Sequence, residues 1–236
     1  MSSNLSALLS ATFYVPGYEH LVELIHQRDD RARRRLASLD LALYDPSGGL
    51  LASSAVDPRD EILDLGAVVT ALADPPPRVM VTFDARYDAE VFPYRPHHYG
   101  YLHRSQSSDP SLYYAVNAVL GGVPDRVGAT NLNNFETYVL RRHPAAARYS
   151  VLLGCLARWA PVEAQVFAHY GTERVLHEVT LQPRQHVEIP LEGEREGHRV
   201  DRVELKSLYR LASYVVGRRD GSDDLVLFDH LFTYFK

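Results

Sequence analysis

The sequence predicts an all-β protein made of two tandem, divergent β-sandwich domains. Three observations carry this prediction. Apolar and polar residues alternate with a period of two wherever a pattern is clear, turn-forming residues separate the alternating runs, and the order of these features recurs in the second half of the chain. A length of 236 residues is enough for two domains that each bury a core.

The predicted strands and turns follow one another along both halves. The clearest alternating runs lie at residues 39–44, 79–83, 162–168 and 187–189. Turn-forming sequences lie at residues 45–49, 170–173 and 220–222. Helix is expected to be a minor element. The apolar stretch 112–120 is predicted to form one short helix, which the pair Gly121-Gly122 would end.

A repeated corner indicates that the halves arose by internal duplication. Residues 56–62 and 181–187 both read apolar, polar, Pro, Arg, two polar, apolar. Because proline cannot donate to a β-ladder, one strand ends there and the next apolar residue begins the return strand. Further matches place 11–15 beside 136–140, and 79–86 beside 211–218.

The predicted organisation is therefore a first sandwich at 1–104, a connecting insert at 105–134 and a second sandwich at 135–236. The two sandwiches are expected to be related by a pseudo-twofold axis.

The second half, with its corner at residues 181–184 (LQPR), resembles the small β-sandwich of soluble sensory-rhodopsin-transducer-type proteins. The shared pattern is a strand pair, a Pro-Arg corner, a return strand and a final pair of strands. The resemblance implies an oligomeric β-sandwich that acts as an adaptor or ligand-binding module rather than as a catalyst. This chain departs from the family in being a tandem with a central insert, so a photoreceptor partner is not implied.

Composition excludes several function classes. A net charge of −5 argues against binding nucleic acid non-specifically. The single cysteine allows no internal disulfide and no cysteine-based zinc site. No apolar run reaches the roughly 18 residues that a membrane span needs. The first ten residues lack the basic start of a secretory signal, so a cytoplasmic location is expected.

Tyrosine is abundant, with 15 residues, and many cluster after residue 83. The insert is also rich in aromatic and amide side chains, which favours packing between domains or a polar binding surface. Tyrosine suits either role, because it combines an apolar ring with a polar tip. The candidate ligand- or partner-binding residues are Tyr94, Tyr99, Tyr101, Tyr113, Tyr114, Asn117, Arg126, Asn131 and Asn133.

Histidines form a second candidate cluster at His97, His98 and His103, with His230 as an approximate equivalent in the second half. On a straight strand His97 and His103 would share a face but stand about 20 Å apart, too far to hold one ion. A metal site would need a bend at Gly100 or a further ligand from the other half.

The predicted function is a non-catalytic binding or adaptor protein that contacts a protein partner or a small ligand and self-associates into a homo-oligomer. No cofactor is expected. Two alternatives stay open: a protein or enzyme that uses a divalent metal at the histidine cluster, and a carbohydrate-binding module. The chain contains no Gly-x-Ser-x-Gly nucleophile motif.

Overall fold

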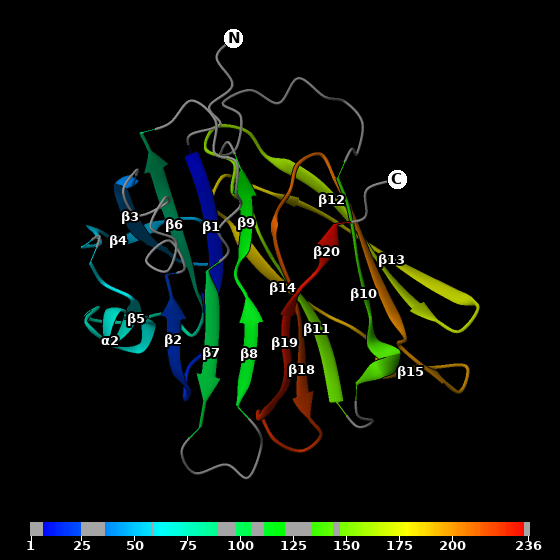
Figure 1. Ribbon diagram of the computed structural model, residues 1–236. Coiled ribbons are helices and arrows are strands. Elements are labelled where there is room, and N and C mark those ends of the chain that lie inside the picture. The colour runs from blue at the N-terminus through cyan, green and yellow to red at the C-terminus, as the bar shows by residue number, and fades with distance from the viewer. Residues whose placement is uncertain are drawn as a thin grey trace. The chain divides into compact units, whose positions relative to one another are not determined.

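The computed structural model (Figure 1) describes residues 7–24, 36–57, 59–88, 98–104, 111–120, 134–143 and 147–233. Over these residues strand is by far the most abundant regular structure, which confirms the predicted all-β class. Helix is confined there to α2 (Leu65–Thr70) and the short 3-10 turn η2 (Leu140–Arg142). The chain divides into unit 1 (Met1–Pro124) and unit 2 (Asp125–Lys236). Five predicted site residues lie outside the described residues: Tyr94, His97, Arg126, Asn131 and Asn133.

Unit 1 contains two antiparallel sheets. The first has the order β4-β3-β6-β1-β9, formed by β4 (Leu50–Ala55), β3 (Leu36–Tyr44), β6 (Val79–Tyr87), β1 (Ala7–Tyr14) and β9 (Asn117–Leu120). The second has the order β5-β2-β7-β8, formed by β5 (Ile62–Asp64), β2 (Glu19–Glu23), β7 (Tyr99–His103) and β8 (Leu112–Ala115).

The core of unit 1 follows from the period-two pattern. Leu41 pairs with Phe83 and Leu43 with Val81, so one face of the first sheet is apolar. All four side chains are at most 2% exposed. Burying each of these side chains stabilises the fold by about 1.5–3 kcal/mol. The ring of Phe83 meets the buried ring of His98, which precedes β7, edge to face at 5.6 Å. The two sheets of unit 1 therefore pack face to face.

The described part of unit 2 contains two antiparallel sheets of four or more strands. The first has the order β13-β12-β17-β10-β20, formed by β13 (Glu173–Leu181), β12 (Val162–Tyr170), β17 (Arg202–Ser207), β10 (Asn134–Val139) and β20 (Phe232–Thr233). The second has the order β14-β11-β18-β19, formed by β14 (His186–Pro190), β11 (Ala147–Gly154), β18 (Ala212–Arg219) and β19 (Leu225–His230). A small hairpin joins β15 (Glu194–Arg195) to β16 (His198–Arg199).

A buried carboxylate links the sheets of unit 2. Glu136 on β10 is 2% exposed and accepts a short hydrogen bond from the hydroxyl of Ser213 on β18. Asn134 donates to its other oxygen at 2.9 Å. Burial raises the pKa of Glu136 because the charged form is poorly solvated there. This contact shows that the two sheets of unit 2 also pack face to face.

The two units share one strand order. Among the described residues, nine strands follow one another in unit 1, and β10–β14 and β17–β20 take the same places in unit 2, where β15 and β16 are additional. The shared strand order supports an internal duplication. The structural correspondence differs from the sequence match, however, because β6 (residues 79–87) corresponds to β17, whereas the sequence match pairs residues 79–86 with residues in β18. The strands at 112–120 take the places of β19 and β20.

The helix predicted over residues 112–120 is wrong. These residues form β8, which pairs with β7, and β9, which pairs with β1. An apolar run of this length does not by itself distinguish strand from helix. Here the choice is made by neighbouring strands with open edges, and the bond from Val116 N–H to the His98 carbonyl at 2.7 Å continues the pairing with the chain before β7. Residues assigned to a connecting insert thus supply strands to both sheets of unit 1.

Candidate functional site

Three of the predicted tyrosines lie on the outer face of the β5-β2-β7-β8 sheet. Successive side chains of a strand point to opposite faces, so Gly100 and Leu102 face the core while Tyr99, Tyr101 and His103 face outward. Tyr113 pairs with Tyr101 and joins them from β8. We call the surface formed by Tyr99, Tyr101, His103 and Tyr113 the tyrosine face. Its most exposed member is Tyr113, at 61%.

The rings of the tyrosine face stack in two pairs. Tyr99 and Tyr113 lie with ring centroids 5.2 Å apart and nearly parallel planes. Tyr101 and His103 stack at 6.2 Å. Ser111 ties the second pair together, because the Tyr101 hydroxyl donates to Ser111 Oγ at 3.1 Å and Ser111 Oγ lies 3.0 Å from His103 Nδ1. The aromatic surface is therefore held in place before any partner binds.

Carboxylates border these rings. Glu23 pairs with Tyr99 across β2 and β7, and its Oε2 accepts from the Tyr113 hydroxyl at 3.3 Å. Glu19 pairs with His103 and is exposed. The four strands of this sheet carry Glu19, Glu23 and Asp64 but no lysine or arginine. The strands that form this surface therefore contribute aromatic rings and negative charge.

Two other predicted binding residues belong to the core of unit 1. Tyr114 is 2% exposed, and its hydroxyl lies 2.6 Å from His20 Nε2 and 2.7 Å from Thr12 Oγ1. Val15 N–H donates to His20 Nδ1 at 3.4 Å, which favours the neutral tautomer with the proton on Nε2. Burial lowers the pKa of His20 to about 3. Asn117 on β9 is likewise buried, at 1% exposure. Tyr114 therefore links the two sheets, and both residues lie in the core rather than on the surface.

The described histidines of the predicted metal cluster do not converge. His98 is fully buried beside Phe83, whereas His103 lies on the opposite, outer face of the same sheet. His230 belongs to unit 2, where it lies within 2.8 Å of the Leu231 carbonyl through Nδ1. Within the described ranges, no group of three or more His, Cys, Asp or Glu side chains could hold a metal ion.

Unit 2 contains a polar cluster that the sequence did not reveal. The Tyr138 hydroxyl lies 2.8 Å from His143 Nε2 and donates to Asp229 Oδ2 at 3.4 Å. Burial, with the neighbouring Asp229 charge, raises the pKa of Tyr138, and burial lowers that of His143. A tyrosine held in its protonated form is a hydrogen-bond bridge rather than a nucleophile. The cluster therefore joins β10 to β19 and suggests no chemistry.

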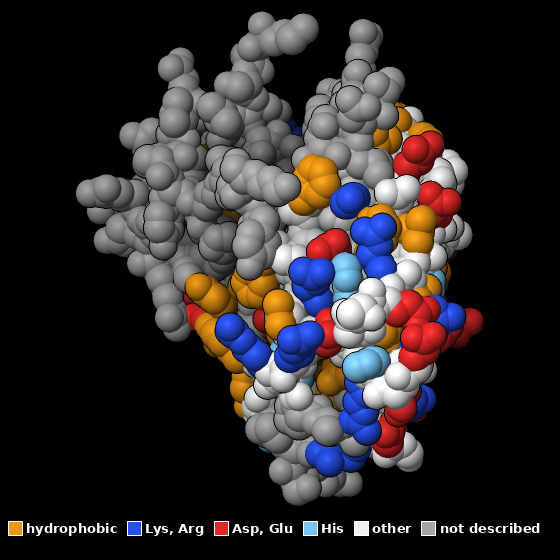
Figure 2. Space-filling view, turned by 90° about the vertical axis from the view of Figure 1, so that its right-hand side faces the viewer, with side chains coloured by type: hydrophobic (Ala, Val, Ile, Leu, Met, Phe, Trp, Pro, Cys, Tyr) orange, Lys and Arg blue, Asp and Glu red, His pale blue; other side chains and the backbone are white. Residues whose placement is uncertain are grey.

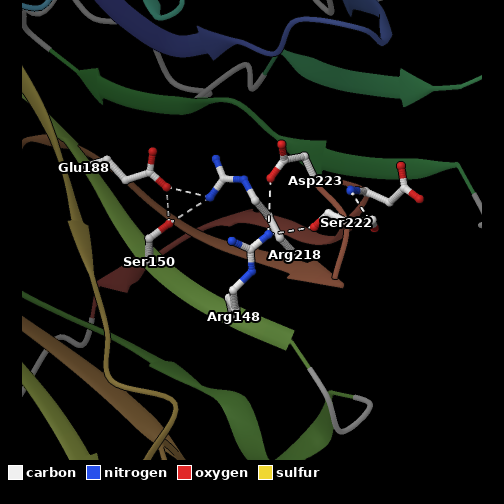
Figure 3. Close-up of polar contacts among 7 residues, drawn as sticks. Arg148, Ser150, Glu188, Arg218, Ser222 and Asp223 are labelled. Carbon is white, nitrogen blue, oxygen red and sulfur yellow. Dashed lines mark hydrogen bonds and ion pairs between the residues drawn. The ribbon is translucent and has the colours of Figure 1, made fainter. Parts of the chain in front are cut away.

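Two arginines in unit 2 are neighbours across β11 and β18, where Arg148 pairs with Arg218 (Figure 3). Arg218 donates to Glu188 Oε1 at 2.6 Å and to Ser150 Oγ at 3.3 Å. Arg148 donates to the Ser222 carbonyl at 2.7 Å and reaches Asp223 at 3.2 Å. Each guanidinium thus has a carboxylate of its own. The cluster is a set of structural ion pairs rather than an anion site.

Sequence reasoning missed Glu19, Glu23 and Ser111 of the candidate surface. The alternation of Glu19, Leu21 and Glu23 along β2 was a usable signal, since it places both carboxylates on one face. Nothing in the sequence pairs β2 with β7, however. No helix in the described part of the chain is long and apolar enough to cross a membrane. No protein-family model matches the chain, and no curated protein shows significant similarity to it.

Proposed function

We propose that this protein is a non-catalytic binding module whose tyrosine face recognises a basic segment of a partner protein. The observation that carries the proposal is the combination of four aromatic rings with the carboxylates of Glu19 and Glu23 on one outer face. Tyrosine rings and carboxylates both attract arginine and lysine, by cation–π contact and by ion pairing. The resemblance to adaptor-type sandwiches points the same way.

A protein segment fits this surface better than a sugar does. Sugar-binding sites usually stack the sugar on tryptophan, whereas the rings of the tyrosine face belong to tyrosine and histidine. The exposed aliphatic side chain of Ile62, which pairs with Glu23, extends the surface with apolar area. Aromatic anchors surrounded by polar groups are typical of protein-binding surfaces. We place the binding event in the cytosol, where a chain with one cysteine loses no stabilising disulfide.

The test uses a random-peptide display library selected on the full chain. The counter-selection uses a double variant in which Tyr99→Ser and Tyr113→Ser remove one stacked pair. We expect the peptides retained by the natural chain alone to be enriched in arginine and lysine. Their binding should weaken as salt is raised, because exposed charge pairs are screened. Glu23→Lys should abolish it by reversing one of the attracting charges.

Trp159→Ser serves as the matched control, because Trp159 is an exposed aromatic residue, at 73%, and lies in unit 2. This variant should bind the selected peptides as the natural chain does. The proposal is rejected if the peptides show no preference for basic residues, or if the double tyrosine variant retains them equally well.

A further inference from the structure

Strand β13 is a long edge strand of unit 2. It pairs with β12 along its whole length of nine residues, from Glu173 opposite Tyr170 to Leu181 opposite Val162. It ends the strand order of its sheet, so within the described residues no strand pairs with its other side. Edge strands of monomeric proteins are usually short or blocked, because their unpaired backbone groups invite a further strand. A nine-residue edge therefore calls for an explanation.

The hairpin turn determines which backbone groups face this open edge. Gly171 has φ +62° at the first position of the two-residue turn, as in a type II′ hairpin. In such a hairpin the closing pair, Tyr170 and Glu173, exchanges both hydrogen bonds, and every second residue then does the same. The N–H and C=O groups of the residues between them point away from β12. Those residues are Arg174, Leu176, Glu178 and Thr180.

The same four residues are exposed on the outer face of the sheet, and their order is self-complementary. Figure 2 shows the side of the molecule on which β12 and β13 lie, where acidic and basic side chains are interspersed with hydrophobic ones. Leu176 is 45% exposed. It stands between a cation at Arg174, whose guanidinium lies 4.5 Å from the Phe167 ring centroid, and an anion at Glu178. When two such strands pair antiparallel, the cation of each strand faces the anion of the other and the two leucines face each other.

We propose that two copies of this chain pair antiparallel through β13, about a twofold axis at Leu176, so that their five-stranded sheets become continuous. In this register Leu176 faces Leu176 of the second copy, and each Arg174 faces a Glu178. Shifting the register by two residues one way places Arg174 opposite Leu176, and the other way places Leu176 opposite Glu178. Only the centred register matches both charges, and in it the outward backbone groups of Arg174, Leu176 and Glu178 are paired with the second copy.

The opposite side of β13 also suits this pairing. Val175 and Val179 are half-buried in the single chain and alternate with Glu173 and His177. In the centred register Val175 faces His177, and Glu173 faces Val179, so no like charges meet there. The inferred interface belongs to unit 2 and goes beyond the proposed function, which rests on the tyrosine face of unit 1.

Sedimentation velocity of the full chain over a concentration series tests the inference. The natural chain should dimerise. Arg174→Glu and Glu178→Arg each bring like charges together at both symmetric contacts, so each should weaken dimerisation about tenfold or more. The double variant exchanges the two charges and should dimerise again. A mixture of the two single variants should form a heterodimer, because every contact across it is then complementary.

Two further variants separate the edge from the rest of the sheet. Glu163→Arg makes the same charge change at an exposed site on β12, one strand away, and should leave dimerisation unchanged. Leu176→Pro removes an outward N–H without touching the β12 ladder, so it should give a monomer with an unaltered far-ultraviolet circular dichroism spectrum. The inference is overturned by a natural chain that stays monomeric, by a dimer that the single charge variants do not weaken, or by single variants that neither the double exchange nor mixing restores.

Discussion

Gly100 should tolerate no side chain, although its backbone conformation does not require glycine. It lies directly opposite Tyr114 in the β7–β8 pair, and the tyrosine ring crosses the space where a side chain would stand. A Cβ atom at Gly100 would overlap the Cζ, Cε1 and Oη atoms of that ring. Gly100→Ala must therefore displace Tyr114, which is 2% exposed and has no open space to enter.

The expected cost has two parts. Forcing a methyl group into a packed core costs about 1–3 kcal/mol. The Tyr114 hydroxyl lies 2.6 Å from His20 Nε2 and 2.7 Å from Thr12 Oγ1, so displacing it removes a hydrogen-bond partner from both atoms. Each buried polar atom left without a partner costs about 1–3 kcal/mol. We therefore expect Gly100→Ala to lower the free energy of unfolding of unit 1 by about 3 kcal/mol or more.

The assay is denaturant unfolding monitored by hydrogen exchange of the β7 and β8 amides. Tryptophan fluorescence is unsuitable, because the single tryptophan lies in unit 2 and would not report on unit 1. Tyr114→Leu provides the background that isolates the clash. With the ring gone, the same Gly100→Ala change should cost less than about 1 kcal/mol, and the two costs should not add. The reasoning fails if Gly100→Ala is neutral, or if it costs the same with and without the tyrosine ring.

Three further predictions concern a pKa, an ion pair and a turn. Burial lowers the pKa of His20 to about 3 in the folded chain, so between pH 6.5 and 3 only the unfolded chain binds a proton at this residue. The free energy of unfolding of unit 1 should therefore fall by about 1.4 kcal/mol for each pH unit below 6.5 in this range. Hydrogen exchange in β1 and β2 measured across this range should show that His20→Gln removes this slope. Glu188→Gln should destabilise unit 2 by about 1–2 kcal/mol, because it leaves half-buried Arg218 without its carboxylate. Exposed Arg148→Met should cost about 0.5 kcal/mol or less, and denaturant unfolding monitored by hydrogen exchange of β11 and β18 measures both. Gly171→Ala should cost about 1 kcal/mol by that assay, since φ is +62° there and a Cβ would lie 3.1 Å from the His198 ring; equal stability would contradict the turn geometry.

Local patterns were sufficient to predict the strands that have one buried face and one more exposed face. The alternation at 39–44 and 162–168 predicted β3 and β12, and the Gly171 turn predicted the hairpin that follows β12. The stretch 112–120 was assigned to the wrong element for a physical reason. Tyr114, Val116 and Ala118 are buried, and the chain passes from one sheet of unit 1 to the other between β8 and β9, so no clean alternation marks the stretch as strand. Its pairing partners also lie far away in the sequence.

For the candidate surface, too, local spacing predicted one part of the arrangement and tertiary packing decided the rest. Because Tyr99, Tyr101 and His103 are two residues apart, the sequence places them on one side of a strand. It cannot say which side is outside. Tyr113 and Tyr114 are neighbours with the same side chain, yet one is 61% and the other 2% exposed. The packing of the other sheet decides this, because only Tyr114 can reach Thr12 and His20.

By itself, the sequence determined the all-β class, the turns at 45–49, 170–173 and 220–222 and the grouping of tyrosines by face, since these depend on the chemistry of neighbouring residues. The tertiary structure alone decided that β8 and β9 complete unit 1, that Glu23 borders the tyrosine face and that β13 is left at an edge. Each of these depends on which strands pair across long separations. Strand pairing is a choice among many partners with similar local propensity, and the packing of the whole sheet makes that choice.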